Sequence, residues 1–519
     1  MLTLLLNLLL FLVLSSLASF FGLRVWINRK LRPNPEDLPE LIISQDSPLY
    51  KNFYGLLDQA PSPNHSMFYP LSPLQDALLE RVKLAEQAVG SIEAQYYMLN
   101  DDEAGDIFLH ALTEAAQRGV KVRLLIDDLD VIQREDVLIR LVDEFPNFQI
   151  RVFNPAWLRL IRKPEFLVRF PRLSRRMHNK SYTVDGIFSI IGGRNIGNEY
   201  FDLKHELIFA DFDILFAGPM VQTVRQEFDT YWYSGLCADI HDLGSAADDE
   251  KYAAWRNKLH STYTEYLPIL MHDRDQTLPA LKRGEIQPYY AEVKVIYDEP
   301  DKILTSVFKP DSRMLQEVEG VINSAQQELL ICAAYFIPSK HGVKLLQSLR
   351  DRGVKITLLT NSFESNDVMV VHGSYSSYRK PLLKMGVRLY ELKSHDRHAD
   401  NKHSLLGSEC TSLHAKAFFI DRHRNFIGSF NMDPRSAIHN TEMGAIFEHH
   451  GYAEMLTQEI YDFVETQAYQ LQLSPRGKLE WREPLADGSY RIHTKEPKMT
   501  PRQRRFLPLI AWLPVEWLL

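Results

Sequence analysis

The chain has 519 residues, of which 45% are hydrophobic and 24% are charged, as is ordinary for a globular protein. This length predicts two domains with appendages, and the net charge of −8 argues against a general nucleic-acid binder. The three cysteines, Cys237, Cys332 and Cys410, are too few and too widely spaced for a disulfide framework or a metal-binding pattern.

The chain opens with 23 residues that carry no charged side chain. Such a run is long enough to cross a bilayer, which takes about 20 apolar residues. Arg24, Arg29 and Lys30 follow it, so the positive-inside rule predicts a cytoplasmic location for what comes after. We favour a transmembrane anchor over residues 1–28. The alternative is a cleaved signal peptide, although the basic n-region is missing and the apolar run is longer than usual.

Two long stretches alternate between helical and strand patterns in the same order. Residues 118–121 and residues 352–355 both read Arg-Gly-Val-Lys and lie 234 positions apart. Helices that alternate with strands are typical of α/β folds with covered parallel sheets. We therefore predict two pseudo-symmetric α/β halves, each a mostly parallel sheet flanked by helices. The predicted helices cover residues 77–89, 104–117, 318–327 and 342–351, and the predicted strands cover residues 91–98, 120–127, 293–297, 328–335 and 354–359.

One motif occurs in both stretches, in copies 236 residues apart. Each copy reads His-x-Lys-x4-Asp, continues with a glycine-led turn that ends in asparagine, and has a glutamate 21 positions after the aspartate. Identical internal spacing in two copies is strong evidence against two ordinary core strands. The first copy consists of His178, Lys180, Asp185, Asn195 and Glu206, and the second consists of His414, Lys416, Asp421, Asn431 and Glu442.

These residue types suit phosphate-ester chemistry. In a strand, side chains two positions apart face the same way, so we expect each histidine beside its lysine. Histidine can act as a nucleophile or a general acid, and lysine can place positive charge against phosphate oxygens. A carboxylate on the far ring nitrogen fixes the tautomer of the imidazole. The set requires neither a metal ion nor a cofactor, because a protonated lysine is not a metal ligand.

The two copies resemble the paired HKD motifs of the phospholipase D superfamily and, within it, the bacterial cardiolipin synthases, the C type most of all. The resemblance runs from about Pro70 to the C-terminus. It implies that the two halves pack face to face and that each gives one motif to a single site. The stretches that carry it are residues 175–180, 192–197, 199–201, 431–436 and 440–442.

The resemblance also implies phosphatidyl transfer through a phosphohistidine, which makes cardiolipin from phosphatidylglycerol and a second phosphatidylglycerol or phosphatidylethanolamine. We choose His178 as the nucleophile and His414 as the general acid and base, although pseudo-symmetry makes them nearly interchangeable. The alternatives are hydrolysis of phospholipid, cleavage of nucleic acid and a non-catalytic membrane scaffold. The remaining roles are phosphate binding by Lys180, Lys416, Asn195 and Asn431, orientation of the histidines by Glu206 and Glu442, and support of the motif strand and loop by Asp185 and Asp421.

The expected partners are anionic and zwitterionic phospholipids in a membrane, and nucleic acid is not expected. The expected location is the bacterial inner membrane, with the catalytic region in the cytoplasm; an accessory protein is left open. Residues 159–176 are basic and apolar, which fits either an anionic lipid surface or a surface segment whose arginines pair with acids. The apolar end of the tail is too short to span a bilayer, and we expect it to pack on the core, with contact at the membrane interface as the alternative.

The predicted organisation has six parts. The segment between the halves holds a helix near residues 252–266 and is interpreted as a linker, with a substrate entrance as the alternative. The parts are the anchor (1–28), a loop-like lead-in rich in Pro, Ser, Asn and Asp (29–69), the first half (70–240), the connector (241–290), the second half (291–480) and a basic then apolar tail (481–519).

Overall fold

The computed structural model describes residues 43, 45–71, 74–129, 131–157, 159, 165, 172–203, 208–271, 277–305, 312–366, 368–394, 412–485 and 487–505. The predicted anchor of residues 1–28 and the apolar end of the tail lie outside this range. Among the helices in these ranges, each is too short or too polar to cross a bilayer.

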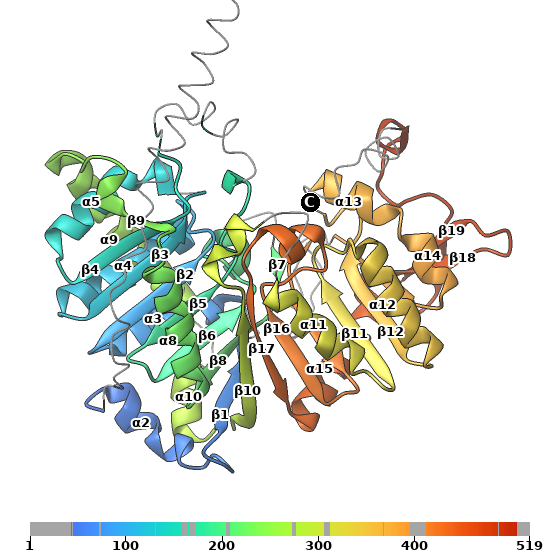
Figure 1. Ribbon diagram of the computed structural model, residues 1–519, viewed down its shortest axis with the longest axis horizontal. Coiled ribbons are helices and arrows are strands. Elements are labelled where there is room, and N and C mark those ends of the chain that lie inside the picture. Colours follow the sequence, from blue (N-terminus) through green and yellow to red (C-terminus); the bar gives the residue numbers. More distant parts are fainter. Residues whose placement is uncertain are drawn as a thin grey trace, which may run out of the picture.

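Eighteen strands of the described chain pair in one continuous sheet that runs through both halves (Figure 1). The halves are joined where β1 of the first pairs with β10 of the second. The first half has the order β9 (Cys237–Asp239), β4 (Phe148–Phe153), β3 (Lys121–Asp127), β2 (Ser91–Tyr96), β5 (Ser181–Val184), β6 (Phe188–Gly192), β8 (Asp213–Ala217) and β1 (His65–Pro70). The second half has the order β10 (Tyr289–Tyr297), β17 (Met443–Glu448), β16 (Arg424–Gly428), β15 (Lys416–Ile420), β11 (Glu328–Ala333), β12 (Lys355–Asn361), β13 (Arg388–Leu392), β18 (Ala468–Leu473), β19 (Leu479–Pro484) and β20 (Tyr490–His493).

The sheet is mixed, so the prediction of mostly parallel sheets is wrong. Parallel pairing is confined to β2–β3–β4 and β11–β12–β13 among the pairs of this sheet. Those strands are separated in sequence by helices long enough to return the chain to the same end of the sheet. By contrast, β5 and β6 are joined by a tight turn, as are β15 and β16, and a tight turn gives antiparallel neighbours.

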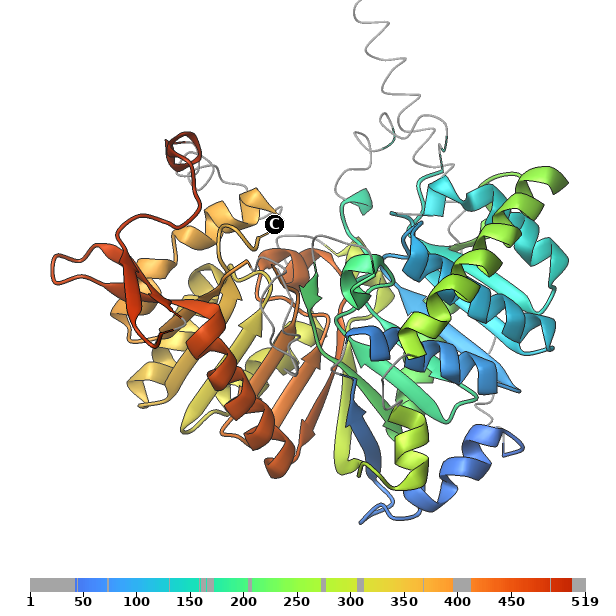
Figure 2. The ribbon, with the colours of Figure 1, turned by 180° about the vertical axis from the view of Figure 1, so that it is seen from behind.

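Helices cover both faces of the sheet (Figures 1 and 2). In the first half, α3 (Leu74–Gln87), α4 (Glu103–Gln117) and α9 (Asp249–Met271) pack together, and α8 (Met220–Trp232) packs on β2, β5, β6 and β8. In the second half, α11 (Arg313–Asn323) and α12 (Ser339–Asp351) pack on the sheet, as does α15 (His450–Gln467). The other described helices are α2 (Pro48–Leu57), α5 (Glu135–Glu144), α7 (Asn198–Phe201), α10 (Thr277–Arg283), α13 (Met369–Ser376) and α14 (Arg379–Lys384).

The predicted connector and lead-in are both built into the folded body. Helix α9 buries Trp255, Leu259 and Leu270 in the core of the first half, so this part of the connector is no loose linker. The described part of the lead-in contains α2 and β1 and is therefore not a loop throughout. Ser47 caps α2 and Pro48 opens it, which explains why the Pro and Ser content was misleading: these residues also favour helix starts.

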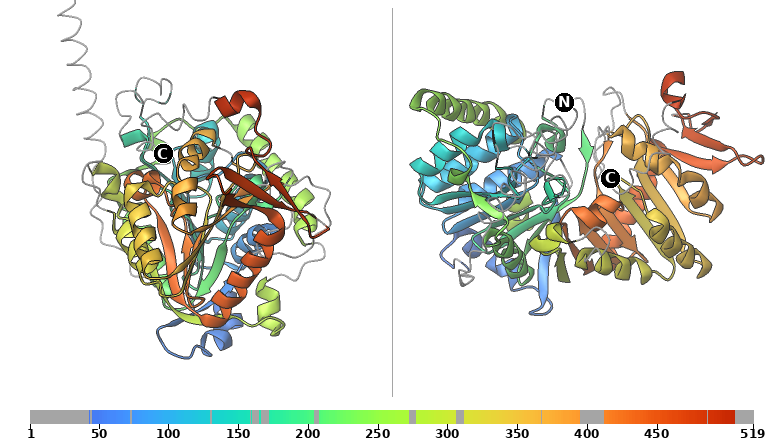
Figure 3. Two further views of the ribbon diagram at one scale, coloured as in Figure 1. Left: turned by 90° about the vertical axis from the view of Figure 1, so that its right-hand side faces the viewer. Right: turned by 45° about the horizontal axis from the view of Figure 1, so that its top comes forward.

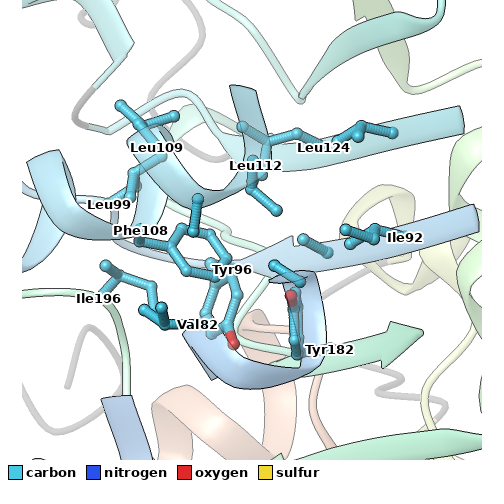
Figure 4. Close-up of a cluster of buried hydrophobic side chains, with 14 of the residues drawn as sticks. Val82, Ile92, Tyr96, Leu99, Phe108, Leu109, Leu112, Leu124, Tyr182 and Ile196 are labelled. Carbon is cyan, nitrogen blue, oxygen red and sulfur yellow. The ribbon is translucent and has the colours of Figure 1, made fainter. Parts of the chain in front are cut away.

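Four buried apolar clusters hold the described part of the molecule together, the smallest of them around Phe153, Tyr231 and Trp232. One fills the first half, where Tyr96, Phe108 and Tyr182 pack between α4 and the sheet (Figure 4). A second fills the other half, and a third contains buried residues of both halves, including Phe212 and Phe419. Viewed with the top of the molecule brought forward, the halves meet along a central seam (Figure 3). Because apolar packing crosses this seam, the two halves form one folded body.

Candidate active site at the seam between the halves

The sequence predicted that the two motif histidines lie within strands, but the structure places each of them just before its strand. His178 precedes β5, which begins at Ser181, and His414 precedes β15, which begins at Lys416. At these points the chain leaves its own sheet and pairs with the other half. The backbone N–H of His178 donates to the Thr441 carbonyl (2.9 Å), and that of His414 donates to the Ala210 carbonyl (2.7 Å).

Each histidine is held by a carboxylate from the opposite half. Nδ1 of His178 lies 2.8 Å from Oε2 of Glu442, and Nδ1 of His414 lies 2.6 Å from Oδ2 of Asp211. Both carboxylates directly follow the residue whose carbonyl binds the backbone of the same histidine. Backbone and side chain are therefore fixed together, and the carboxylate occupies Nδ1 of each ring.

Asp211 occupies the position that the sequence analysis assigned to Glu206, a residue that lies outside the described ranges. The strand register identifies the equivalence. Gly192 pairs with Asp213 in β6–β8, Gly428 pairs with Gly444 in β16–β17, and Asp211 and Glu442 both lie two positions before these partners. The loop from Gly192 to Asp211 spans 19 positions and the loop from Gly428 to Glu442 spans 14, so equal spacing from the aspartate pointed to the wrong residue.

The two lysines are buried against the histidines. Nζ of Lys180 donates to the His178 carbonyl at 2.6 Å. Nζ of Lys416 lies 2.9 Å from Nδ1 and 3.2 Å from Nε2 of His414. Lys180 is 2% exposed and Lys416 is 1% exposed, so little water screens their charge. Positive charge held in such a place favours a bound anion.

Burial decides the protonation of this cluster. It lowers the pKa of His178 to about 4, against the opposing effect of Glu442, and lowers the pKa of His414 to about 4, with Lys416 acting in the same direction. Burial also lowers the pKa of Lys180 well below its usual value. Burial alone would raise the pKa of Glu442, but His178 and Lys180 lower it overall. At neutral pH, neutral imidazoles thus donate Nδ1–H to ionised carboxylates.

Each motif asparagine follows its histidine by 17 positions, and Asn195 is linked to His414 of the other half through Tyr200. Nδ2 of Asn195 donates to the Tyr200 hydroxyl (2.8 Å), and the ring of Tyr200 meets that of His414 edge-on. The backbone N–H of Asn431 donates to Oγ of Ser436 at 3.2 Å. Oδ1 of both asparagines is buried without a hydrogen-bond partner. Buried polar atoms without partners are unusual and mark places where a ligand can bind.

The motif aspartates lie at the other end of their strands. The Asp185 carboxylate accepts from the backbone N–H groups of Val89, Gly90 and Ser91, and the Asp421 carboxylate accepts from those of residues 326–328. Seven extended residues separate His178 from Asp185, about 23 Å at 3.3 Å per residue. The two aspartates therefore fix the turn that precedes β2 or β11, which agrees with the structural role expected for them.

Part of the basic stretch 159–176 lies next to the site. Arg159 pairs with Asp128 and Glu135, and Nη1 of Arg176 lies 3.2 Å from Asp127. The side chain of Arg175 donates to the carbonyls of residues 303 and 305. These arginines are therefore occupied by contacts within the protein. Residues 160–164 and 166–171, which carry the other basic side chains apart from Arg172, lie outside the described ranges.

No group of His, Cys, Asp and Glu in the described part of the chain has the arrangement of a metal site. The chemistry available in these residues is that of two imidazoles, two lysine side chains and two carboxylates at one seam. Such a set can attack a phosphorus atom, stabilise its oxygens and protonate a leaving oxygen.

Comparison with known proteins gives a consistent result. A family model described as "Cardiolipin synthase, PLD-like domain" matches residues 82–232 and 318–463. Cardiolipin synthase C of Escherichia coli (strain K12) is 38% identical over 469 residues, which cover 88% of this chain and 97% of that protein. A cardiolipin synthase of Geobacillus kaustophilus is 25% identical over 385 residues, which cover 73% of this chain and 62% of that protein. The crystal structure of phosphatidylserine synthase from Haemophilus influenzae has the same fold, with a TM-score of 0.58 at 13% identity over 90% of this chain and 99% of that one.

Removal of the Asp211 side chain should allow both tautomers of His414 to form and should leave the tautomer of His178 unchanged. The contact with Asp211 holds the proton of His414 on Nδ1, whereas free imidazole divides it between both nitrogens. We expect ¹⁵N NMR of histidine-labelled protein at pH 7 to show mixed tautomers for His414 in Asp211→Ala and for His178 in Glu442→Ala. Glu206→Ala is the matched control and should change neither ring. A shift of His414 in that control alone would assign its carboxylate to Glu206.

Acid should destabilise the protein through the two histidines. Their folded pKa of about 4 lies below the unfolded value of about 6.5, so the unfolded chain binds more protons between these pH values and stability falls as pH drops through that window. From pH 7 to pH 5 the loss should be about 2 kcal/mol for each histidine. Urea unfolding of the wild type and of His178→Asn/His414→Asn at both pH values isolates this contribution, because the other groups titrate in both proteins. Equal pH dependence in the two proteins would show that the imidazoles are not neutralised by burial.

Proposed function

The chain belongs to the cardiolipin synthase, PLD-like domain family, and on that basis we propose that it is a membrane-associated phosphatidyltransferase that makes cardiolipin from two phospholipids. The observation that supports this most directly is the exchange across the seam, in which each histidine is held by the other half's carboxylate. Both contacts lie at the seam between the halves, which supports a single site that uses both motifs, as a reaction with two different histidine roles requires.

In the first half-reaction, Nε2 of His178 attacks the phosphorus of the donor lipid. A P–N bond forms, and the bond between phosphorus and the headgroup oxygen breaks. Nε2–H of His414 supplies the proton that the leaving headgroup takes. His414 must be protonated for this step, and a phosphodiester anion bound next to it raises its pKa in the required direction.

In the second half-reaction, His414 takes a proton from the incoming hydroxyl. The hydroxyl oxygen forms a bond with phosphorus while the P–N bond to His178 breaks, so the histidine is regenerated. An acceptor hydroxyl on phosphatidylglycerol gives cardiolipin, and water gives phosphatidic acid. The released alcohol is glycerol for a phosphatidylglycerol donor and ethanolamine for a phosphatidylethanolamine donor.

Lys180, Lys416, Asn195 and Asn431 are the groups that we assign to the phosphate oxygens. The negative charge on those oxygens grows when phosphorus becomes five-coordinate, and buried ammonium groups stabilise such charge strongly because little water competes. Glu442 and Asp211 hold the rings in the productive tautomer and stabilise the imidazolium forms that occur during turnover.

The two histidines should both be essential for transfer. We expect His178→Ala and His414→Ala to lose at least about 1,000-fold in turnover, because each removes a nucleophile or an acid. Mixed micelles of labelled phosphatidylglycerol, with and without phosphatidylethanolamine, would be assayed for cardiolipin, phosphatidic acid and released headgroup. His110→Ala is the control: His110 is also buried, but it lies on α4 against Tyr263 and should keep wild-type turnover.

The outcomes of this assay separate the candidate functions. Phosphatidic acid as the main product would indicate a hydrolase, and cleavage of DNA in a parallel assay would indicate a nuclease. Substantial cardiolipin formation by either histidine variant would overturn the two-histidine mechanism. No turnover by the wild type in any assay would leave a non-catalytic membrane protein.

We place the catalytic region on the cytoplasmic face of the bacterial inner membrane, because positive charges follow the apolar run of the first 23 residues. A reporter that is active only in the cytoplasm, fused to the C-terminus, should be active in cells. An active periplasmic reporter at the same position would reverse this orientation.

A further inference from the structure

A buried aspartate that belongs to neither motif holds the residue that orients His178. Asp298 directly follows β10 and is 1% exposed. Its backbone N–H donates to the Glu442 carbonyl (3.0 Å), and its Oδ2 accepts from the Glu442 backbone N–H (3.2 Å). Asp298 therefore binds both backbone polar groups of Glu442, the residue whose side chain contacts His178.

Lys302 connects Asp298 to the loop that follows the second motif. Its Nζ lies 2.7 Å from Oδ2 of Asp298 and donates to the Ser436 carbonyl at 2.9 Å. Oγ of Ser436 in turn accepts from the backbone N–H of Asn431. Lys302 is 1% exposed, so the ion pair is fully inside the protein. One buried pair thus supports both the carboxylate that orients His178 and the backbone of a proposed phosphate ligand.

The second oxygen of Asp298 anchors a helix. Oδ1 accepts from the Ser312 hydroxyl (3.1 Å) and from the Met314 backbone N–H (3.2 Å) at the start of α11. The hydrogen-bond partners of this carboxylate are all donors, namely an ammonium, a hydroxyl and two backbone N–H groups, and the charged Glu442 side chain is also near it. A neutral amide in its place would turn an NH2 group towards donors in either orientation.

The first half has a different buried ion pair near the residue equivalent to Glu442. There Asp213, two positions after Asp211, pairs with the buried Arg81 at 2.7 Å. The residue two positions after Glu442 is Gly444, which has no side chain and packs against Phe426. The second half therefore obtains its anion from β10, which pairs with β17 from Val293 to Tyr297.

We infer that Asp298, charge-balanced by Lys302, is a positioning residue that fixes Glu442 and, through it, the imidazole of His178. This inference rests on the proposed phosphatidyl transfer for its kinetic readout. Asp298 acts through another residue, so its loss should lower kcat and leave KM nearly unchanged.

The test is Asp298→Asn against a matched control. We expect kcat for cardiolipin formation to fall about 10- to 100-fold, the range for loss of a group that orients a functional side chain. In the same variant, ¹⁵N NMR should show mixed tautomers for His178 only. Glu391→Gln is the control, because Glu391 also sits buried among donors, namely Arg379, Tyr375 and Trp481, but contacts no residue of the site. It should lose stability and keep wild-type kcat and tautomers.

A double variant separates positioning from folding. Asp298→Asn/Lys302→Met removes the two charges together, so stability should recover relative to Asp298→Asn, because a lone buried ammonium is no longer present. kcat should stay low, because the Glu442 backbone still lacks its anionic acceptor. Recovery of kcat along with stability would overturn the inference, as would wild-type kcat and tautomers in Asp298→Asn. If the wild type makes no cardiolipin, the proposed transfer fails, and the NMR comparison of His178 still decides the role of Asp298.

Discussion

Each half supplies the carboxylate that contacts the motif histidine of the other half, and the rest of the structure depends on this constraint. His178 is useful only if Glu442 reaches its ring, and His414 only if Asp211 does. Each of these contacts joins residues more than 200 positions apart, so it requires both halves to be folded and docked. The continuous sheet and the shared apolar cluster at the seam provide that docking. Behind Glu442, the buried Asp298–Lys302 pair binds the backbone of that residue.

The electrostatic design follows from burial. In water a histidine beside a carboxylate would gain a proton, but at this seam desolvation outweighs the attraction and keeps the rings neutral. A neutral ring retains the lone pair that a nucleophile needs. A protonated lysine beside these rings favours an anion at the seam.

Much of this arrangement is readable from the amino-acid sequence. The paired motifs identified both histidines, both lysines and Glu442, and the predicted helices and strands agree with the structure within a few residues at most boundaries. Periodicity predicts elements but not the direction in which neighbours run, so the antiparallel pairing of β5, β6 and β8 was missed. Helix α2 was also missed, because proline and serine are common both in loops and at the first positions of helices.

Asp211 and Asp298 were missed for different physical reasons. A fixed offset from Asp185 cannot find Asp211, because the first-half loop is longer and only the strand register restores the equivalence with Glu442. Aligning the residues before β8 with those before β17, where a carboxylate precedes an apolar strand in both, would have found it. In the described part of the first half, the buried ion pair near the equivalent place is Arg81–Asp213, whose aspartate lies on β8 itself, so the internal repeat does not point to Asp298.

The backbone bond from His178 to Thr441 also bears on how the protein is synthesised. A ribosome finishes the first motif long before it reaches the residues that complete it. In the nascent chain, His178 therefore lacks its partners Thr441 and Glu442 until those residues have been made. Fragments released early by stalled translation would lack the contacts that complete the site.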